Sequence, residues 1–371
     1  SWTDLAPVGR SKGRFLMTIK VLSIFGTRPE AIKMAPVVKA LEAHPEFESK
    51  VCVTAQHREL LDQVLELFEI TPDVDLNLMK PNQTLAGLTA AVFSNLDPVL
   101  EEIKPDWVLV QGDTTTVMSA ALCAFYRQIR VGHVEAGLRT GNKWRPFPEE
   151  INRKVAGVVA DLHFAPTEWS MGNLLKEYVR TNQIVVTGNT VIDALLQVAE
   201  KPFELADSPL ADLPTDKRLV VITAHRRENH GEPLLRICDA IRQLAERYAD
   251  DVHFVYSVHP NPNVKKIVQE QLGDYANITL LPPPDYFPFV HLMKRASLML
   301  TDSGGIQEEA PGLGVPVLVL RKVTERPEGI KAGTVKLVGT DVDLIVNEAS
   351  KLLDDSEAHA AMAQAVNPYG D

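Results

Sequence analysis

The sequence predicts an α/β protein of two doubly wound domains, each a parallel sheet with helices on both faces, which face each other across a cleft. Two observations support this fold class. Apolar runs of strand length alternate with helical segments along most of the chain, a pattern typical of parallel sheets. With 371 residues, the chain is also too long for one ordinary core and suits two domains of this size.

The first half opens with an apolar run at 19–25 and a helical pattern that continues through Ala43. Pro29 fits the start of that helix, because its missing N–H would have no partner there. Further strands are expected at 51–54, 107–110, 131–134, 162–165 and 184–187. Further helices are expected at 60–68, 85–103, 115–126, 150–160 and 170–178.

The second half repeats the plan. Its strands are expected at 219–223, 253–258, 278–281, 298–300 and 317–320, and its helices at 234–248, 264–272, 289–295 and from Ile306 onward. Residues 201–217 have weak periodicity and indicate a surface excursion. We place the boundary after Gly188, which gives domains 17–188 and 189–371, and we interpret residues 1–16 as an extension ahead of a natural start at Met17.

Charge and composition narrow the possible partners. The net charge of −11 argues against a nucleic-acid partner and against binding to an anionic membrane. No apolar run approaches membrane-spanning length, and residues 1–16 lack the apolar segment of a signal peptide. Cys52, Cys123 and Cys238 lie far apart, without zinc or redox spacing. We therefore expect a cytoplasmic protein with buried cysteines, whose phosphate site, if any, is a local basic pocket.

One turn late in the chain suits an anion. In the stretch 298–320, a strand is followed by a polar turn, a helix and a second strand. Gly304 and Gly305 allow close approach of a ligand to the backbone, Ser303 can cap the helix, and the N–H groups of its first turn point toward the ligand. An ordinary capped helix with acids at its positive end would explain the same residues.

Three carboxylates follow predicted strands of the first domain. Asp113 follows strand 107–110, Glu135 follows strand 131–134, and Glu149 opens the next helix. Helix capping or a salt bridge would explain each one singly. Because all three would meet at one sheet edge, we expect acid/base chemistry, with the pKa of at least one of them raised.

The second domain contributes cations and a histidine. His225 follows a strand beside Arg226 and Arg227, and it could charge or donate a hydrogen bond to a leaving group. His259 also follows a strand, where a rigid turn and a ligand role are equally supported. Arg326 lies near the same rim.

Arg28, Lys33 and Phe289 are further candidates for the same site. Arg28 and Lys33 lie at the N-terminus of the first helix and one turn inside it. Phe289 offers an aromatic face to a base, although core packing is the commoner use of such a residue. A cationic, glycine-rich wall opposite an acidic wall suits a nucleotide-diphosphate sugar. The spacing indicates no metal site and no nicotinamide cofactor.

Ten motifs together resemble the non-hydrolysing UDP-N-acetylglucosamine 2-epimerases, from about Met17 to the end of the chain. The motifs lie at 26–36, 54–65, 112–116, 131–140, 148–153, 164–167, 187–195, 223–229, 259–264 and 302–318. The resemblance implies two Rossmann-like domains of the GT-B type, and a last helix that would lie beyond Asp371. It also implies a homodimer and no cofactor.

The resemblance supplies the expected reaction, which is interconversion of UDP-N-acetylglucosamine and UDP-N-acetylmannosamine by anti elimination of UDP and syn re-addition through 2-acetamidoglucal. It assigns proton transfer to the three carboxylates, and UDP departure to His225 and Arg28. The implied substrate-binding residues are Arg28, Lys33, Phe289, Ser303, Gly304, Gly305, Glu309 and Arg326. Candidates for a second, activating UDP-N-acetylglucosamine site are Gln56, Arg227 and His259.

Three alternatives share these residues. A retaining glycosyltransferase of the same architecture would need an acceptor cleft, and a nucleotide-sugar sensor would not need the carboxylates. A hydrolysing relative would release free N-acetylmannosamine. The three-carboxylate wall favours the epimerase.

Overall fold

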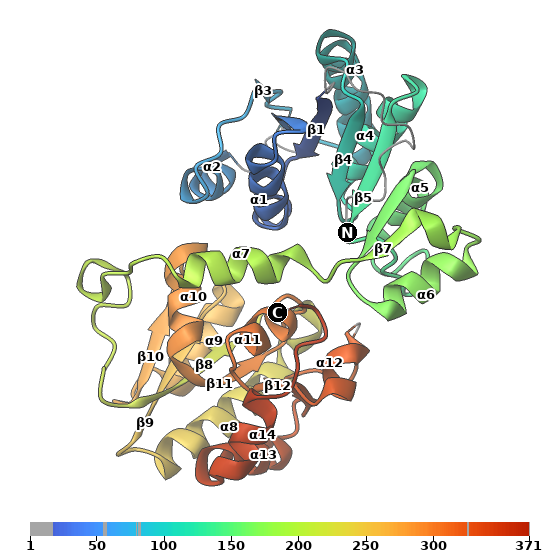
Figure 1. Cartoon of the computed structure of the whole chain (residues 1–371). Helices are drawn as coiled ribbons and strands as arrows, with labels where there is room; N and C mark the ends of the chain where they lie inside the picture. Colours follow the sequence, from blue (N-terminus) through green and yellow to red (C-terminus); the bar gives the residue numbers. More distant parts are fainter. Residues whose placement is uncertain (1–17, 55–57, 79, 81–82, 325, 371) are drawn as a thin grey trace.

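The computed structural model describes residues 18–54, 58–78, 80, 83–324 and 326–370, with the side chain of Arg227 left out. It confirms the predicted α/β class. Two parallel sheets, each with helices packed on both faces, form an upper and a lower body in Figure 1.

The first sheet has seven strands in the order β3-β2-β1-β4-β5-β6-β7. They are β1 (Ile19–Phe25), β2 (Phe47–Val53), β3 (Val74–Asp75), β4 (Trp107–Gln111), β5 (Arg130–Val134), β6 (Leu162–Ala165) and β7 (Ile184–Val186). The helices are α1 (Arg28–Ala43), α2 (Arg58–Leu67), α3 (Leu85–Ile103), α4 (Thr115–Tyr126), α5 (Glu149–Val159) and α6 (Glu168–Lys176). Alternate residues of β1 enter the two cores on either side of the sheet, as a doubly wound sheet requires.

The second sheet has six strands in the order β10-β9-β8-β11-β12-β13. They are β8 (Arg218–Thr223), β9 (Val252–Ser257), β10 (Ile278–Leu281), β11 (Ala296–Thr301), β12 (Val317–Val319) and β13 (Val335–Leu337). The helices are α8 (Glu232–Arg247), α9 (Pro262–Leu272), α10 (Tyr286–Arg295), α11 (Ile306–Gly312), α12 (Pro327–Ala332), α13 (Val342–Asp354) and α14 (Ser356–Ala363).

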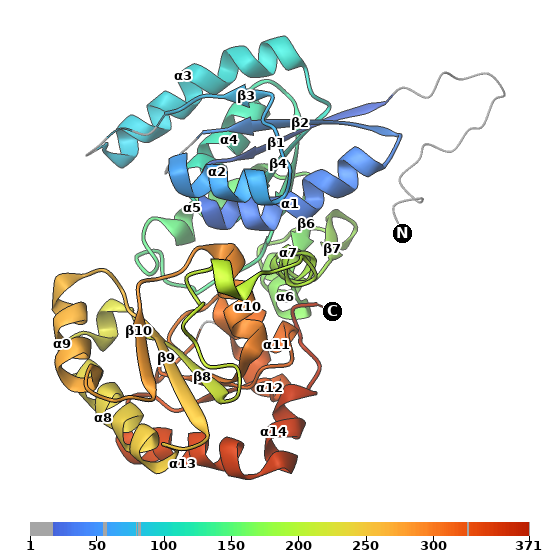
Figure 2. The same cartoon turned by 90° about the vertical axis from the view of Figure 1, so that its left-hand side faces the viewer.

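Helix α7 (Thr190–Ala199) lies between the two sheets and was not predicted. It packs against α1 on one side and against α10 and α11 on the other. Ile192, Leu195 and Val198 are fully buried in a core cluster that also contains Phe25 of the first sheet and Met299 of the second. The apolar core is therefore continuous from one domain to the other, and α7 is its shared element (Figure 2).

The short edge strands β3 and β13 were also missed, because two or three residues carry too little periodicity to predict a strand. The expected burial of the three cysteines is confirmed. In the part of the chain that the structure describes, no helix combines the length and the apolar character needed to cross a membrane.

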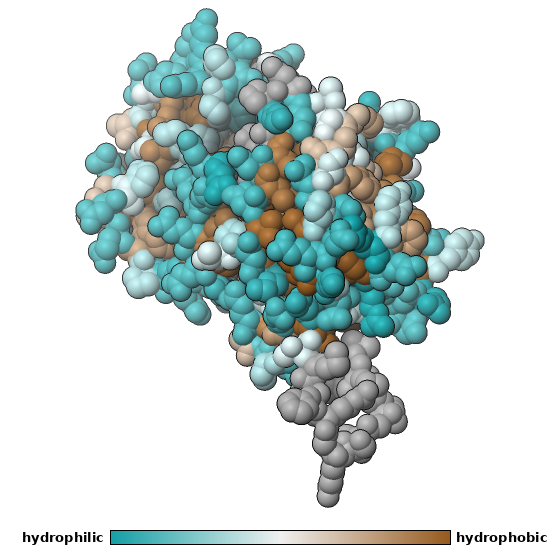
Figure 3. Space-filling model, turned by 90° about the horizontal axis from the view of Figure 1, so that it is seen from above, coloured by the Kyte–Doolittle hydropathy of each residue, from teal (hydrophilic) through white to brown (hydrophobic). Residues whose placement is uncertain are grey.

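The outer face of the first domain is mostly hydrophilic, with apolar residues between the polar ones (Figure 3). Exposed apolar residues of this domain include Phe125 and Tyr126 at the end of α4 and Val158 on α5.

Candidate active site

A buried carboxylate that the sequence analysis missed holds the loop between β1 and α1. Thr27 and Glu30 form a capping box at the start of α1. Glu30 Oε2 accepts hydrogen bonds from the N–H groups of Gly26 and Thr27, both at 2.8 Å. Its Oε1 accepts a hydrogen bond of 2.5 Å from the Thr114 hydroxyl. Glu30 therefore ties the β1–α1 loop to the β4–α4 loop.

The carboxyl ends of β4 and β5 lie level, because Gln111 pairs with Val134. Asp113 and Glu135 follow these two residues, as predicted. Glu135 has a left-handed backbone with φ of 60°, which is unfavourable for a residue with a Cβ and is commonly found at functional sites. A Cβ built on Gly112 would lie 4.0 Å from Glu135 Oε1, so the Glu135 side chain reaches the loop that carries Asp113.

Glu135 forms an ion pair with Lys33 across the ends of β5 and α1, with Nζ and Oε2 2.5 Å apart. Both side chains are largely buried. Burial pushes the pKa of Glu135 upward, but the charge and hydrogen bond of Lys33 and the charge of Arg326 outweigh it, and the pKa is lowered. We expected a raised pKa for at least one of the three carboxylates. Glu135 is not that one, because its carboxylate has a cation partner. Glu135 is ionised at neutral pH.

Asp113 also has a cation partner that the sequence did not indicate. Arg153 of α5 donates to Asp113 Oδ2 at 2.5 Å, and the side-chain amide of Asn152 donates to the Asp113 carbonyl at 2.9 Å. The N-cap of α4 is Thr114. Helix capping, the simple explanation for Asp113, is thus excluded.

Glu149 is the first residue of α5 and makes no side-chain cap for that helix. Its Oε2 atom is buried and has no hydrogen-bond partner among the described residues. A buried carboxylate oxygen without a partner is rare. It leaves an unused acceptor at the start of α5, the helix that also carries Arg153, the partner of Asp113.

In the second sheet, pairing of Thr301 with Thr223 places the loops after β11 and β8 side by side. Asp302, which is fully buried, accepts hydrogen bonds from the backbone N–H groups of His225 and Arg226 and from the side-chain amide of Asn229. Its Oδ1 also lies 3.3 Å from His225 Nδ1. Burial lowers the pKa of His225 against the opposing charge of Asp302, so the imidazole is neutral at pH 7. Asp302 sets the position of the His225 loop.

The glycine-rich turn after β11 has the predicted location, but Ser303 does not cap α11. The N-cap position is Gly305, which offers no side-chain acceptor, and the Ser303 carbonyl instead accepts a hydrogen bond from Gln307. The residue after an N-cap is the first helical residue. A helix capped by Ser303 would therefore begin at Gly304, whereas α11 begins at Ile306. The Ser303 hydroxyl is thus not used for capping.

The two domains meet through a polar cluster at the start of α7. Glu308 on α11 pairs with Arg326, with Oε1 and Nε 2.6 Å apart. Asn189 Nδ2 donates to Glu308 Oε2 at 2.5 Å and to Glu135 Oε2 at 2.9 Å. Lys33 is also close enough for the charges of Glu308 and Arg326 to affect its pKa. The structure therefore brings the predicted Lys33, Glu135 and Arg326 together.

Glu309 lies beside this cluster and beside Tyr286, whose hydroxyl is 3.5 Å from Glu309 Oε1. Burial and the neighbouring charge of Glu308 raise the pKa of Glu309 to about 7, although the charges of Lys33 and Arg28 act against this. Arg28 on the first domain thus lies close to α11 of the second.

The raised pKa of Glu309 predicts a pH-dependent cost in stability. Its ordinary value is 4.5, so the folded state holds this proton more tightly than the unfolded state. The resulting stabilisation is complete below pH 4.5 and is lost as the pH rises through about 7, with a loss on the order of 3 kcal/mol. We expect Glu309→Gln to raise the melting temperature above that of the wild type at pH 8 and to leave it unchanged at pH 4.5. Equal shifts at both pH values would contradict this.

The remaining predicted residues are more scattered. His259 stacks on His225, with ring centroids 6.1 Å apart. Among the described residues, no hydrogen bond or ion pair joins either histidine to the carboxylates of the first domain. Phe289 lies on α10 and is partly buried against the shared core. Gln56 and the side chain of Arg227 lie outside the described part of the chain.

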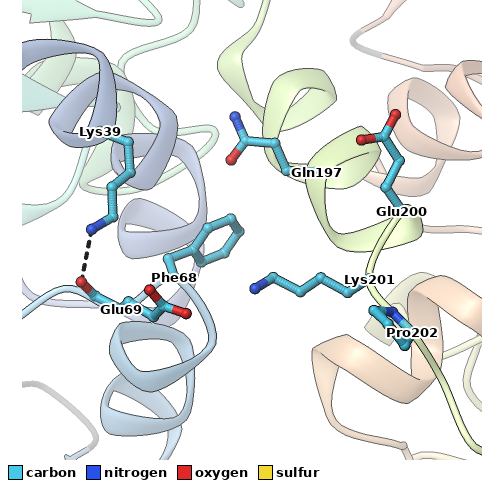
Figure 4. Close-up of a pocket in the computed structure, with 7 residues that line it drawn as sticks. All are labelled: Lys39, Phe68, Glu69, Gln197, Glu200, Lys201 and Pro202. Carbon is cyan, nitrogen blue, oxygen red and sulfur yellow. Dashed lines mark hydrogen bonds between the residues drawn. The ribbon is translucent and has the colours of Figure 1, made fainter. Parts of the chain in front are cut away.

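A pocket of about 440 Å³ lies at the opposite end of α7 from Asn189 (Figure 4). One lysine in it, Lys39, donates to the Glu69 carbonyl at 2.7 Å. None of the predicted site residues lines this pocket. Its lining residues are Lys39, Phe68, Glu69, Gln197, Glu200, Lys201 and Pro202.

Two Rossmann-like domains of the GT-B type, with paired carboxylates at the strand ends of one and a glycine-rich turn in the other, define an enzyme of the nucleotide-sugar class. The comparison with known proteins identifies the family. The sequence model named UDP-N-acetylglucosamine 2-epimerase matches residues 39–371, and the chain belongs to this family of isomerases.

Individual relatives support the same family. The chain is 55% identical over 359 residues to UDP-N-acetylglucosamine 2-epimerase of Escherichia coli (strain K12), covering 95% of each protein. It is 52% identical to the Neisseria meningitidis UDP-GlcNAc 2-epimerase solved with UDP-GlcNAc bound, covering 95% of this chain and 96% of that one at a TM-score of 0.84. A kitacinnamycin glycosyltransferase shares only the fold, with 10% identity, 93% of each chain covered and a TM-score of 0.62.

Proposed function

We propose that this chain interconverts UDP-N-acetylglucosamine and UDP-N-acetylmannosamine by inverting carbon 2 of the sugar. Its family membership and the substrate named for the Neisseria structure support this. The observation that carries the proposal is the pair of carboxylates at the level ends of β4 and β5, Glu135 and Asp113, each held by a cation.

The UDP part of the substrate belongs to the second domain. Gly304 and Gly305 bind the diphosphate through their backbone N–H groups and Ser303 through its hydroxyl, since the Ser303 N–H donates to Thr301 Oγ1. Arg28 and Arg326 supply positive charge. Glu309 accepts hydrogen bonds from the ribose hydroxyls, and Phe289 lies near the uracil. This arrangement directs the sugar toward Lys33 and the carboxylates.

The first half-reaction is an anti elimination. A carboxylate takes the proton from carbon 2, the carbon 1–oxygen bond breaks, and a double bond forms between carbons 1 and 2. The electron pair of the broken bond leaves with UDP. The negative charge on UDP raises the pKa of His225, which then donates a hydrogen bond to the leaving group together with Arg28.

The second half-reaction is a syn addition to the bound 2-acetamidoglucal. UDP re-forms the bond to carbon 1, and a protonated carboxyl group delivers a proton to the other face of carbon 2. Proton removal and return thus require groups on two faces, which Glu135, Asp113 and Glu149 provide. Each half-reaction couples a proton transfer at carbon 2 to cleavage or formation of the bond between carbon 1 and oxygen. No hydride is transferred, so this route uses no nicotinamide cofactor.

Incubation with UDP-N-acetylglucosamine in heavy water tests this function, with the sugar followed by NMR. We expect UDP-N-acetylmannosamine with deuterium at carbon 2, because the solvent exchanges with the carboxyl proton. Free sugar with UDP would indicate a hydrolase instead. No change without an acceptor would indicate the glycosyltransferase or the sensor.

The resemblance extends the proposal to the setting of the enzyme. We place it in the cytoplasm as a homodimer that supplies N-acetylmannosamine-type sugars for surface polysaccharides. The exposed Phe125 and Tyr126 offer an apolar surface for dimer contact. Gln56, Arg227 and His259 are the candidates for a second UDP-N-acetylglucosamine site.

A further inference from the structure

Asn189 lies in the motif at 187–195, and no role in the reaction has been assigned to it above. It is the N-cap of α7, the helix shared by both domains, and only 4% of its surface is exposed. Its own side-chain oxygen caps the helix by accepting the N–H of Val191 at 3.2 Å. Because the oxygen is used there, the orientation of the amide is fixed and its NH₂ group faces away from the helix.

That NH₂ group has two hydrogens and two acceptors, which come from different domains. Nδ2 is 2.9 Å from Oε2 of Glu135 at the end of β5 and 2.5 Å from Oε2 of Glu308 on α11. Both carboxylates are at least nine-tenths buried. One amide thus links the proposed proton-transfer group to the helix that follows the glycine-rich turn.

The charges of this cluster balance around the neutral amide. Glu135 pairs with Lys33, and Glu308 pairs with Arg326, so two carboxylates face two cations. An amide can donate to both carboxylates without changing this balance. A carboxylate in its place would add a third negative charge in a buried position, which is strongly unfavourable.

The backbone around Asn189 is also fixed from both sides. Its N–H donates to the carbonyl of Tyr369 at 2.7 Å, and the side-chain amide of Asn367 in the same segment donates to the Glu308 carbonyl at 3.0 Å. The hydroxyl of Thr190 donates to the Lys33 carbonyl on α1 at 2.6 Å. The position of Asn189 therefore depends on both domains.

We propose that Asn189 is a positioning residue that couples the docking of the two domains to the placement of Glu135. The Asn189 amide holds Glu135 against Lys33 only when the Glu308 helix is in place. The carboxylate is thereby set for proton transfer when the UDP-binding loop is closed over the substrate. This inference rests on the proposed role of Glu135.

The coupling has a consequence for the intermediate. The glucal and UDP are separate molecules between the two half-reactions, so only the docked domains keep them together. Without the amide bridge, Glu135 is misplaced and the domains separate more easily. The second half-reaction then competes with escape of the glucal.

Two variants test this in the full-length enzyme. Asn189→Ser keeps a helix cap and removes the NH₂ group that makes both hydrogen bonds. Asn189→Asp keeps the shape and the cap but adds a charge. Asp355→Asn is the control, because it makes the reverse exchange of carboxylate and amide at the exposed N-cap of α14. The readouts are kcat, KM, UDP affinity, and the ratio of released glucal to epimerised product.

We expect Asn189→Ser to lower kcat about 10- to 100-fold, as a misplaced catalytic group does, with UDP affinity changed less than threefold and the glucal fraction increased. Asn189→Asp should lower kcat further, and Asp355→Asn should match the wild type. A kcat for Asn189→Ser within twofold of the control, or a loss of activity with the glucal fraction unchanged, would overturn the coupling. If Asn189→Ser does not fold, the isosteric Asn189→Asp tests the coupling instead, through the same ratio of released glucal to epimerised product.

The failure of this inference can be told apart from failure of the proposed function. If the wild type incorporates no deuterium at carbon 2, the proposed function fails. If the wild type incorporates deuterium and the Asn189 variants behave like Asp355→Asn, only the coupling fails.

Discussion

Replacement of Glu135 by glutamine should lower kcat by about a hundred- to ten-thousand-fold, the usual contribution of one acid/base group. Glutamine keeps the shape of the side chain but cannot accept the carbon 2 proton. Binding of UDP should persist, because the change leaves Ser303, Gly305 and Arg28 in place and frees the positive charge of Lys33. Asp113→Asn and Glu149→Gln should also nearly abolish turnover while leaving UDP bound.

Steady-state kinetics and UDP calorimetry on the same preparations check this prediction. Glu101→Gln is a suitable control, because Glu101 lies on α3, has a side chain 69% exposed and pairs with Arg127 outside the site. If Glu135→Gln lost UDP binding in proportion to kcat, Glu135 would be a binding residue and its proposed role would be wrong.

Among changes in the second domain, removal of the Asp302 carboxylate should cause the largest loss of stability. Asp302→Ala leaves the N–H groups of His225 and Arg226 without their acceptor, and the amide of Asn229 keeps only the Leu320 carbonyl. Each buried donor without a partner costs about 1–3 kcal/mol, so the total is on the order of 3–5 kcal/mol. The loop that carries His225 should lose its fixed position, and kcat should fall with it.

Hydrogen exchange of the segment 223–229 measures this directly. A local loss of 3 kcal/mol corresponds to amide exchange about a hundredfold faster. Asp343→Ala, on the exposed side of α13, should leave the segment unchanged. Unaltered exchange in Asp302→Ala would show that the loop is held by other contacts.

The sequence was sufficient to predict the fold class and the strand-end positions of Asp113, Glu135, His225 and Ser303. In a parallel sheet, the residues that follow the strands lie at one edge of the sheet. The order of strands and helices along the chain is therefore enough to predict that these residues share that edge. The same reasoning failed for α7, because the segment after Gly188 was interpreted as a domain boundary rather than as a helix buried between two domains.

The partners of these residues could not be predicted, because they come from distant segments. Arg153 meets Asp113 across 40 residues, and Asn189 meets Glu308 across 119. The raised pKa that we expected among the carboxylates depended on an absence of such partners. Two missed residues did leave a local signal. Glu30 completes a capping-box pattern with Thr27, and Asp302 directly follows a buried strand.

The proposed reaction breaks and re-forms the bond between carbon 1 and UDP at this site. The most direct test uses UDP-N-acetylglucosamine labelled with ¹⁸O in the oxygen that bridges carbon 1 and the β-phosphate. If UDP is eliminated and stays bound, the β-phosphate rotates and the label moves into non-bridging positions, which ³¹P NMR resolves. We predict this scrambling in the recovered substrate and in the epimer. Inversion of carbon 2 with all of the label retained in the bridge would contradict the elimination of UDP.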